Sequence, residues 1–148
     1  MTPSEPERKT PDHRVNTIAM LGQAYSLLGF RIVDGVVGAG YPQKPKHSAV
    51  FAQLGPEGAR LTDLARGAGM TPQAMGEVVD ELEELGYVRR EPDPADRRAK
   101  RVMLTPLGID CVRAAVTTID GIEADIESVI GADGHARLRE LLAALLAG

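Results

Sequence analysis

Residues 71–108, which read TPQAMGEVVDELEELGYVRREPDPADRRAKRVMLTPLG, decide the fold. Thr71 precedes Pro72, an order typical of the first turn of a helix, because the hydroxyl caps a free N–H group and proline lacks one. Gly86 is the residue type that ends a helix in the left-handed conformation. The apolar residues between these signals recur at the spacing of one helix face: Met75, Val78, Val79, Leu82 and Leu85. The stretch therefore predicts a helix with one buried face.

A β-hairpin is predicted directly after this helix. Residues 87–90 and 101–104 each have the length and composition of a short strand, and the charged residues 91–98 between them contain two prolines. Thr105 and Pro106 repeat the cap-and-proline order and predict a long helix.

A second, shorter helix is predicted upstream. Leu61–Ala65 opens it, with Thr62 as the expected N-cap, and Gly67 and Gly69 form a tight turn before residue 71. Two helices joined in this way form a helix-turn-helix, whose second helix enters the major groove of DNA with its N-terminal residues. The residues expected there are Thr71, Pro72, Gln73 and Gly76.

Gln73 has the side chain for a bidentate contact with adenine or a bond to phosphate, and Thr71 can bond a phosphate. A merely exposed helix position is the alternative for Gln73.

Positive charge is concentrated in the hairpin. The chain has a net charge of −4, yet residues 89–101 hold six basic residues against three acidic ones. Focused charge of this kind is typical of a DNA-binding wing, with a solvated surface hairpin as the alternative reading. The expected phosphate contacts are Arg89, Arg90, Lys100 and Arg101.

The flanking segments complete a division into four parts. Apolar residues at helical spacing predict a helix from Val15 to about Val37, and a short helix is expected from 48 to 54. Residues 131–134 interrupt the C-terminal pattern before a final leucine-rich helix. We expect a mobile arm at 1–13, N-terminal helices for dimerisation and a pocket at 14–54, a winged helix-turn-helix lobe at 55–105, and C-terminal dimerisation helices at 106–148. The fold class is mainly α (α+β), with a two-stranded wing.

Other classes are disfavoured by what the sequence lacks. Cys111 is the only cysteine, which excludes an intrachain disulfide and fits a cytoplasmic protein. It is expected in the core, with redox sensing as the alternative. The three histidines are widely spaced, so no metal site is expected. No apolar run approaches the ~18 residues of a membrane span, and no nucleophile–base pair or cofactor loop indicates an enzyme.

Residues 61–108 resemble the multiple-antibiotic-resistance regulator (MarR) family. The wing sequence Asp-Pro-Ala-Asp-Arg-Arg-Ala at 93–99, followed by Leu-Thr-Pro-Leu-Gly at 104–108, carries the resemblance. It implies that Arg98 enters the minor groove and that Asp96 orients it, with Arg97 as the alternative. It also implies a homodimer on a roughly palindromic operator.

Many members of that family bind small aromatic molecules between the dimerisation helices and the DNA-binding lobe. The residues in the corresponding part of this chain are Tyr25, Phe30, Tyr41, His47 and Phe51. Core packing is the alternative for the aromatic residues, and a surface position near a helix start is the alternative for His47.

The function expected from these features is that of a DNA-binding transcriptional regulator, most simply a repressor released by a small aromatic ligand. The alternative is a winged-helix module that binds proteins and not DNA.

Overall fold

The computed structural model describes residues 12–148. The arm expected at 1–13 therefore lies outside the described residues, apart from its last two. The elements in chain order are α1 (Thr17–Gly38), the 3-10 helix η1 (Pro45–His47), α2 (Ser48–Phe51), β1 (Ala59–Arg60), α3 (Leu61–Gly67), α4 (Pro72–Glu84), β2 (Val88–Pro92), β3 (Lys100–Leu104) and α5 (Pro106–Ala147).

The core lies where α4 meets the sheet, α2, α3 and the long helices. The inner face expected for α4 is buried at four of its five positions, and Leu85 lies at the exposed edge. Cys111 is buried in the same cluster, as expected for a core residue. The buried residues of the cluster are Val36, Val50, Leu54, Leu64, Ala65, Met75, Val78, Val79, Leu82, Tyr87, Val88, Val102 and Cys111.

The helix-start signals at 71 and 105 are confirmed. Thr71 Oγ1 accepts a hydrogen bond from the Ala74 N–H at 3.1 Å, and Thr105 Oγ1 accepts from the Gly108 N–H at 3.1 Å. Gly86 has φ of 82° immediately after the C-cap of α4. The cap expected at Thr62 is wrong, because α3 begins one residue earlier and Arg60 occupies the N-cap position without a side-chain bond.

The sheet has three strands, whereas the sequence predicted two. Strands β2 and β3 form the expected antiparallel hairpin, in which Arg90 lies opposite Val102. The third strand, β1, pairs with the other edge of β3, so the strand order is β1-β3-β2. Because β1 has only two residues, it is too short to show the alternation of apolar and polar residues by which a strand is predicted from sequence.

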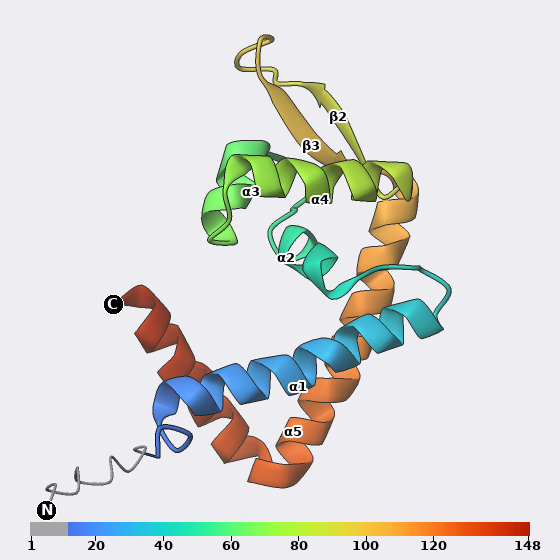
Figure 1. Cartoon of the computed structure of the whole chain (residues 1–148). Coiled ribbons are helices and arrows are strands. Elements are labelled where there is room, and N and C mark those ends of the chain that lie inside the picture. Colours follow the sequence, from blue (N-terminus) through green and yellow to red (C-terminus); the bar gives the residue numbers. More distant parts are fainter. Residues whose placement is uncertain (1–11) are drawn as a thin grey trace, which may run out of the picture.

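Helix α1 packs against α5 at the end of the molecule opposite the hairpin (Figure 1). The interruption expected at 131–134 is confirmed as a sharp kink, because Gly131 has φ of 77° and ψ of 162° inside α5. The last part of α5 then turns back towards the start of α1 (Figure 1). Within residues 12–148, no helix is long and apolar enough to cross a membrane.

Candidate functional site

The first turn of α4 presents an open face. Thr71, Pro72 and Gln73 are exposed, and so is Glu77 one turn later. Gly76 is half-buried, and an added Cβ would lie 3.9 Å from a methyl carbon of Leu61 in α3. Because glycine has no side chain, nothing projects from the helix at this position. The residues expected to face DNA therefore share one side of the helix start.

The tip of the hairpin carries the freest cations. The side chain of Arg98 is 97% exposed, and its Nε lies 3.9 Å from Asp96 Oδ1. The same Asp96 oxygen accepts a hydrogen bond from the Arg98 backbone N–H at 3.1 Å, so Asp96 shapes the turn more than it holds the guanidinium. Arg97 and Lys100 are also exposed and have no acidic partner among residues 12–148.

Three basic residues expected to contact phosphate have partners inside the chain. Arg89 donates to Glu91 and to the Leu104 carbonyl, both at 3.0 Å. Arg90 pairs with two carboxylates of α4, those of Asp80 and Glu83. Arg90 of the hairpin thereby neutralises part of the acidic surface of α4.

Arg101, the third of these residues, lies in β3 near the loop end of the hairpin. It donates to the backbone carbonyls of Glu57 at 3.1 Å and Gly58 at 2.8 Å, and its Nη1 lies 3.4 Å from Asp93 Oδ2. These contacts tie β3 to the turn that precedes β1.

Asp93 is the residue at the wing that the sequence interpretation missed. Its side chain is only 4% exposed, and Oδ2 accepts from Arg60 Nε at 2.8 Å while Oδ1 accepts from the Ala95 N–H at 2.8 Å. The bond from Arg60, followed by that from the Ala95 N–H, lowers the pKa of Asp93 to about 2. The carboxylate therefore joins β1, β2 and β3 where the strands of the hairpin meet its loop.

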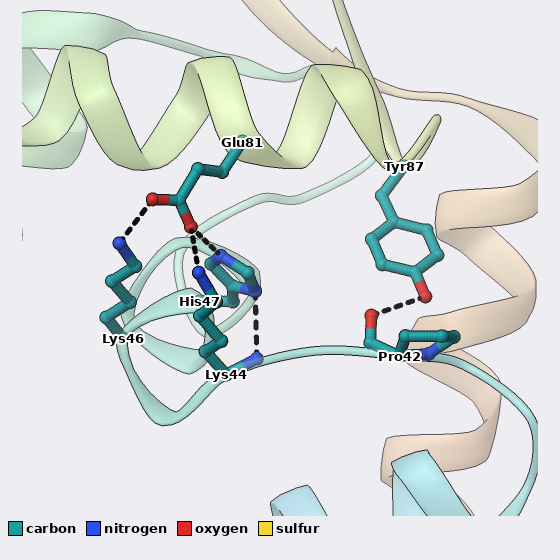
Figure 2. Close-up of polar contacts among 6 residues, drawn as sticks. All are labelled: Pro42, Lys44, Lys46, His47, Glu81 and Tyr87. Atoms are coloured by element: carbon teal, nitrogen blue, oxygen red, sulfur yellow. Dashed lines mark hydrogen bonds and ion pairs between the residues drawn. The ribbon is translucent and has the colours of Figure 1, made fainter.

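A second polar cluster joins α4 to η1 (Figure 2). His47 is 1% exposed, its Nδ1 accepts from the Lys44 N–H at 3.0 Å, and its Nε2 lies 3.0 Å from Glu81 Oε2. A ring nitrogen that accepts a backbone hydrogen bond carries no proton, so the proton of the neutral ring lies on Nε2 and is donated to Glu81. Burial, opposed in part by Glu81, lowers the pKa of His47.

Glu81 also forms ion pairs with two lysines that flank η1 or lie in it. Lys46 Nζ bonds to Oε1, and Lys44 Nζ lies 3.3 Å from Oε2. These contacts, with Lys46 and then His47 contributing most, lower the pKa of Glu81 to about 2. The Tyr87 hydroxyl donates to the Pro42 carbonyl at 2.8 Å, which gives the segment a further anchor beyond the C-terminus of α4 (Figure 2).

A cavity of about 290 Å³ lies between α1, α2 and α5. Its walls are largely apolar, with Gln43 and Ser48 among the lining residues. Gln43 Oε1 and Ser48 Oγ are themselves buried and make no hydrogen bond in the described part of the chain. The lining residues are Tyr25, Gly29, Ile32, Gln43, Ser48, Phe51, Ala52, Cys111, Val112, Ala115, Val116 and Ile119.

Only part of the predicted aromatic set lines this cavity. Tyr25 and Phe51 do, and Phe30 lines a neighbouring recess of about 170 Å³ together with Tyr25. Tyr41 packs against the core. The surface position considered for His47 is wrong, because the ring is buried and both nitrogens are engaged. Gln43 and Ser48 were missed, since neither belongs to a motif that indicates a cavity.

A short helix, a turn, a second helix with an open first turn, and a basic hairpin together define a winged helix-turn-helix protein. The family model described as the MarR family matches residues 44–99. Over these residues, which include η1, α2, α3, α4 and β2, the chain is similar to the MarR family.

The transcriptional regulator HosA of Escherichia coli O111:H- is 32% identical to this chain over 82 residues. The match covers 55% of this chain and 61% of HosA, so it spans less than two thirds of that relative.

Solved structures share the fold over most of the chain. A probable transcriptional regulator from Pseudomonas aeruginosa is 26% identical, with a TM-score of 0.71 over 88% of this chain and 97% of that one. The repressor CouR bound to a 23-mer DNA duplex is 22% identical, with a TM-score of 0.73 over 93% and 99% of the two chains. CouR of Rhodococcus jostii RHA1 bound to p-coumaroyl-CoA is 23% identical, with a TM-score of 0.71 over 91% and 95%.

Proposed function

We propose that this chain is a cytoplasmic, sequence-specific DNA-binding regulator that represses transcription as a homodimer and is released by a small aromatic ligand. The observation that carries the DNA-binding part is the wing tip. Arg97 and Lys100 are exposed there without an ion pair in residues 12–148, and Arg98 is 97% exposed with only a 3.9 Å contact to Asp96. Arg89, Arg90 and Arg101 are paired within the chain. Cations free of internal partners are the ones that can neutralise phosphates without first breaking an ion pair.

Each exposed group then has a distinct role. Gln73 reads a base edge or bonds a phosphate in the major groove, and Thr71 bonds a phosphate at the start of α4. Arg98 inserts into the minor groove, where the negative potential is strongest in narrow regions. Arg97 and Lys100 contact the flanking phosphates. Arg89, Arg90 and Arg101 position the hairpin through their internal bonds. They also contribute to its positive electrostatic potential.

The dimer is supported by apolar side chains that one chain leaves uncovered. They lie on the first half of α1 and on the second half of α5. These residues are Ile18, Leu21, Tyr25, Val129, Leu138, Leu141, Leu145 and Leu146. A patch of this kind on a small protein marks an interaction site, and a symmetric pair would bury it.

Release by a ligand is supported by the position of the cavity. Gln43 and Ser48 contribute to its wall, and the residues between them form the cluster on Glu81 of α4. A ligand that displaces this segment therefore acts on the helix proposed to read DNA. CouR, which shares the fold, has been solved both with DNA and with p-coumaroyl-CoA. Ligand would favour a dimer in which the two α4 helices no longer match successive grooves.

The test is selection of bound fragments from random DNA by the purified full-length chain, followed by affinity measurements on the best site. We expect a short palindrome, and we expect Arg98→Ala to weaken binding by about 10- to 100-fold, in line with the loss of one specific arginine contact. Arg113→Ala is the matched control, because this exposed arginine lies on α5 and pairs within its own helix. Failure to enrich any sequence, at low salt as well as at physiological salt, would favour the protein-binding winged helix instead.

A further inference from the structure

Helix α4 carries five carboxylates, and three of them are bonded within the chain. The five are Glu77, Asp80, Glu81, Glu83 and Glu84. Arg90 bonds Asp80 and Glu83, and three side chains of segment 44–47 bond Glu81. Within residues 12–148, Glu77 and Glu84 make no hydrogen bond or ion pair. Two negative charges of the helix are therefore left without a counter-charge.

Glu77 lies on the outward face of α4, one turn beyond Gln73. The inner face consists of Met75, Val78, Val79 and Leu82. Gln73 and Glu77 are four residues apart, so both project from the opposite side of the helix, about 6 Å apart along its axis. Both side chains are exposed, and Gly76 beside them has no side chain. A helix that brings Gln73 to the base edges therefore brings Glu77 there as well.

Glu84 shares this face but lies in the last turn of α4. It is seven residues beyond Glu77, which is about 10 Å further along the helix axis. The major groove is about 12 Å wide, and a recognition helix contacts base edges with its N-terminal residues. Of the two carboxylates without a counter-charge, Glu77 is therefore the one that meets DNA.

A carboxylate in the major groove can gain a bond from only some of the bases. The phosphates repel it on every sequence alike. Its oxygens accept hydrogen bonds, and the donors in the groove are N4 of cytosine and N6 of adenine, whereas guanine and thymine offer acceptors. Adenine also presents the N7 acceptor beside N6, which repels the carboxylate, while cytosine presents its donor alone. Cytosine is the base that suits a carboxylate best.

We propose that Glu77 recognises one cytosine in each half-site of the operator and excludes the other bases at that position. The proposal rests on the proposed function, because it takes α4 as the helix in the major groove. The bond from cytosine N4 offsets the repulsion by the phosphates, and the other bases leave that repulsion without compensation. Glu77 therefore contributes to specificity mainly by weakening the binding of wrong sequences.

The internal pairing of the other carboxylates limits this effect to one position. Asp80 also lies on the outward face, three residues beyond Glu77, but Arg90 Nη2 lies 2.8 Å from its Oδ1. A carboxylate that is already bonded to a guanidinium repels phosphate less and has less capacity to accept from a base. The hairpin thus neutralises the neighbouring charge and leaves that of Glu77.

The test repeats the selection from random DNA with four full-length proteins: wild type, Glu77→Gln, Glu77→Ala and Glu84→Gln. We expect the wild-type site to hold cytosine at one position in each half-site. Glu77→Gln should change this base to adenine, because an amide bonds both N6 and N7 of adenine. Glu77→Ala should accept all four bases there, with the other positions of the site unchanged.

Affinities are then measured for four duplexes that differ only at this position. Wild type should prefer the cytosine duplex to the guanine and thymine duplexes by about tenfold or more. Glu77→Ala should bind all four about equally, and it should bind unrelated DNA more tightly than wild type does, because the repulsion is removed. Glu84→Gln loses the same charge and should keep the wild-type preference. Melting curves check that each variant is folded.

Three results would overturn the proposal while leaving DNA recognition in place. The first is that both Glu77 variants select the wild-type sequence. The second is that Glu77→Ala binds all four duplexes more tightly by the same factor, since the carboxylate would then only repel. The third is that Glu84→Gln changes the base preference as much as Glu77→Gln does. If the wild-type chain enriches no sequence at all, the proposed function itself fails, and Glu77 has no base to recognise.

Discussion

His47 is a buried histidine whose surroundings determine both its tautomer and its charge. Its Nδ1 accepts the Lys44 N–H, an interaction open only to the unprotonated nitrogen. Protonation would therefore cost this bond and place a charge in a site that is 1% exposed. Glu81 compensates in part, but burial is the larger effect, and the pKa of His47 lies below its ordinary value of 6.5.

This lowered pKa predicts a pH-dependent stability between pH 7.5 and 5.5. In the unfolded chain His47 takes up a proton as the pH falls through about 6.5. In the folded chain the same protonation needs a lower pH. The stability that the neutral ring contributes is therefore full above that value and is lost as the pH falls below it. Urea denaturation at the two pH values should show a larger loss of unfolding free energy for wild type than for His47→Gln. The other histidines remain in both proteins, so equal losses would contradict the prediction.

Asp93 should stabilise the wing more than its neighbour Asp96 does. Asp93→Asn removes the counter-charge of Arg60 and Arg101 next to the hairpin loop, whereas Asp96→Asn alters an exposed side chain. We expect Asp93→Asn to lower Tm at pH 7 by several degrees and Asp96→Asn to change it little.

The pKa of Asp93 provides the internal check on this comparison. A carboxylate held at a pKa of about 2 contributes stability that is full above its ordinary value of 3.8 and is lost as the pH falls towards 2. The Tm difference between wild type and Asp93→Asn should therefore shrink across that interval. A difference that stays constant down to pH 2 would mean that the asparagine disturbs packing and not charge.

At the scale of elements, the start of α5 is held unusually close to the backbone of Tyr87, the residue before β2. A Cβ built on Gly108 would lie 2.0 Å from the Tyr87 carbonyl oxygen, which is backbone and cannot turn aside. Gly108→Ala should therefore cost about 1–3 kcal/mol of unfolding free energy, the usual range for overpacking.

Gly121→Ala, on the same helix, is the matched control. A Cβ added to Gly121 would meet nothing within 4 Å, and alanine favours the helix over glycine by about 0.5–1 kcal/mol. Opposite signs for the two substitutions, measured by urea denaturation, are the expected result. A neutral Gly108→Ala would show that α5 can shift away from Tyr87 without cost.

The elements that sequence could predict are those with strong local signals. Thr71, Thr105 and Gly86 mark helix ends through contacts within four residues, and all three are confirmed. Strand β1 could not be predicted, because its two residues are extended only through pairing with β3, some forty residues away. The cap expected at Thr62 was wrong because Ala59 and Arg60 are extended by pairing with β3, so the helix begins directly afterwards, at Leu61, and no side chain caps it.

The candidate site divides in the same way. Sequence located the basic wing and the open face of α4, since both follow from residue type and helix spacing. It could not show that Arg90 is paired, because its partners Asp80 and Glu83 lie on α4 and are brought near only by the fold. The cavity wall and the cluster on Glu81 likewise combine segments that are distant in sequence.

At the scale of the whole molecule, the hairpin lies at one end, and α1 with the second half of α5, the segments proposed to form the dimer, lies at the other (Figure 1). One chain leaves apolar residues uncovered at the start of α1 and at the end of α5, among them Ile18, which is 83% exposed, and Leu145, which is 66% exposed. These residues are distant from the core of the lobe that carries α3, α4 and the sheet. Pairing of two chains and folding of that lobe are therefore separable properties.

The combined substitution Ile18→Glu with Leu145→Glu tests this separation. Charges at both positions should convert a dimer into a monomer in sedimentation experiments, while the far-ultraviolet circular dichroism stays that of a helical protein. Operator affinity should fall by about 100-fold or more, because the second lobe no longer binds at the high effective concentration that the first provides. The dependence of affinity on salt should also weaken, since one lobe displaces fewer counter-ions than two. Val37→Glu, at the other end of α1, is the control and should leave both properties unchanged. A double variant that remains dimeric would place the interface elsewhere, and a monomer with full affinity would mean that one lobe reads its site alone.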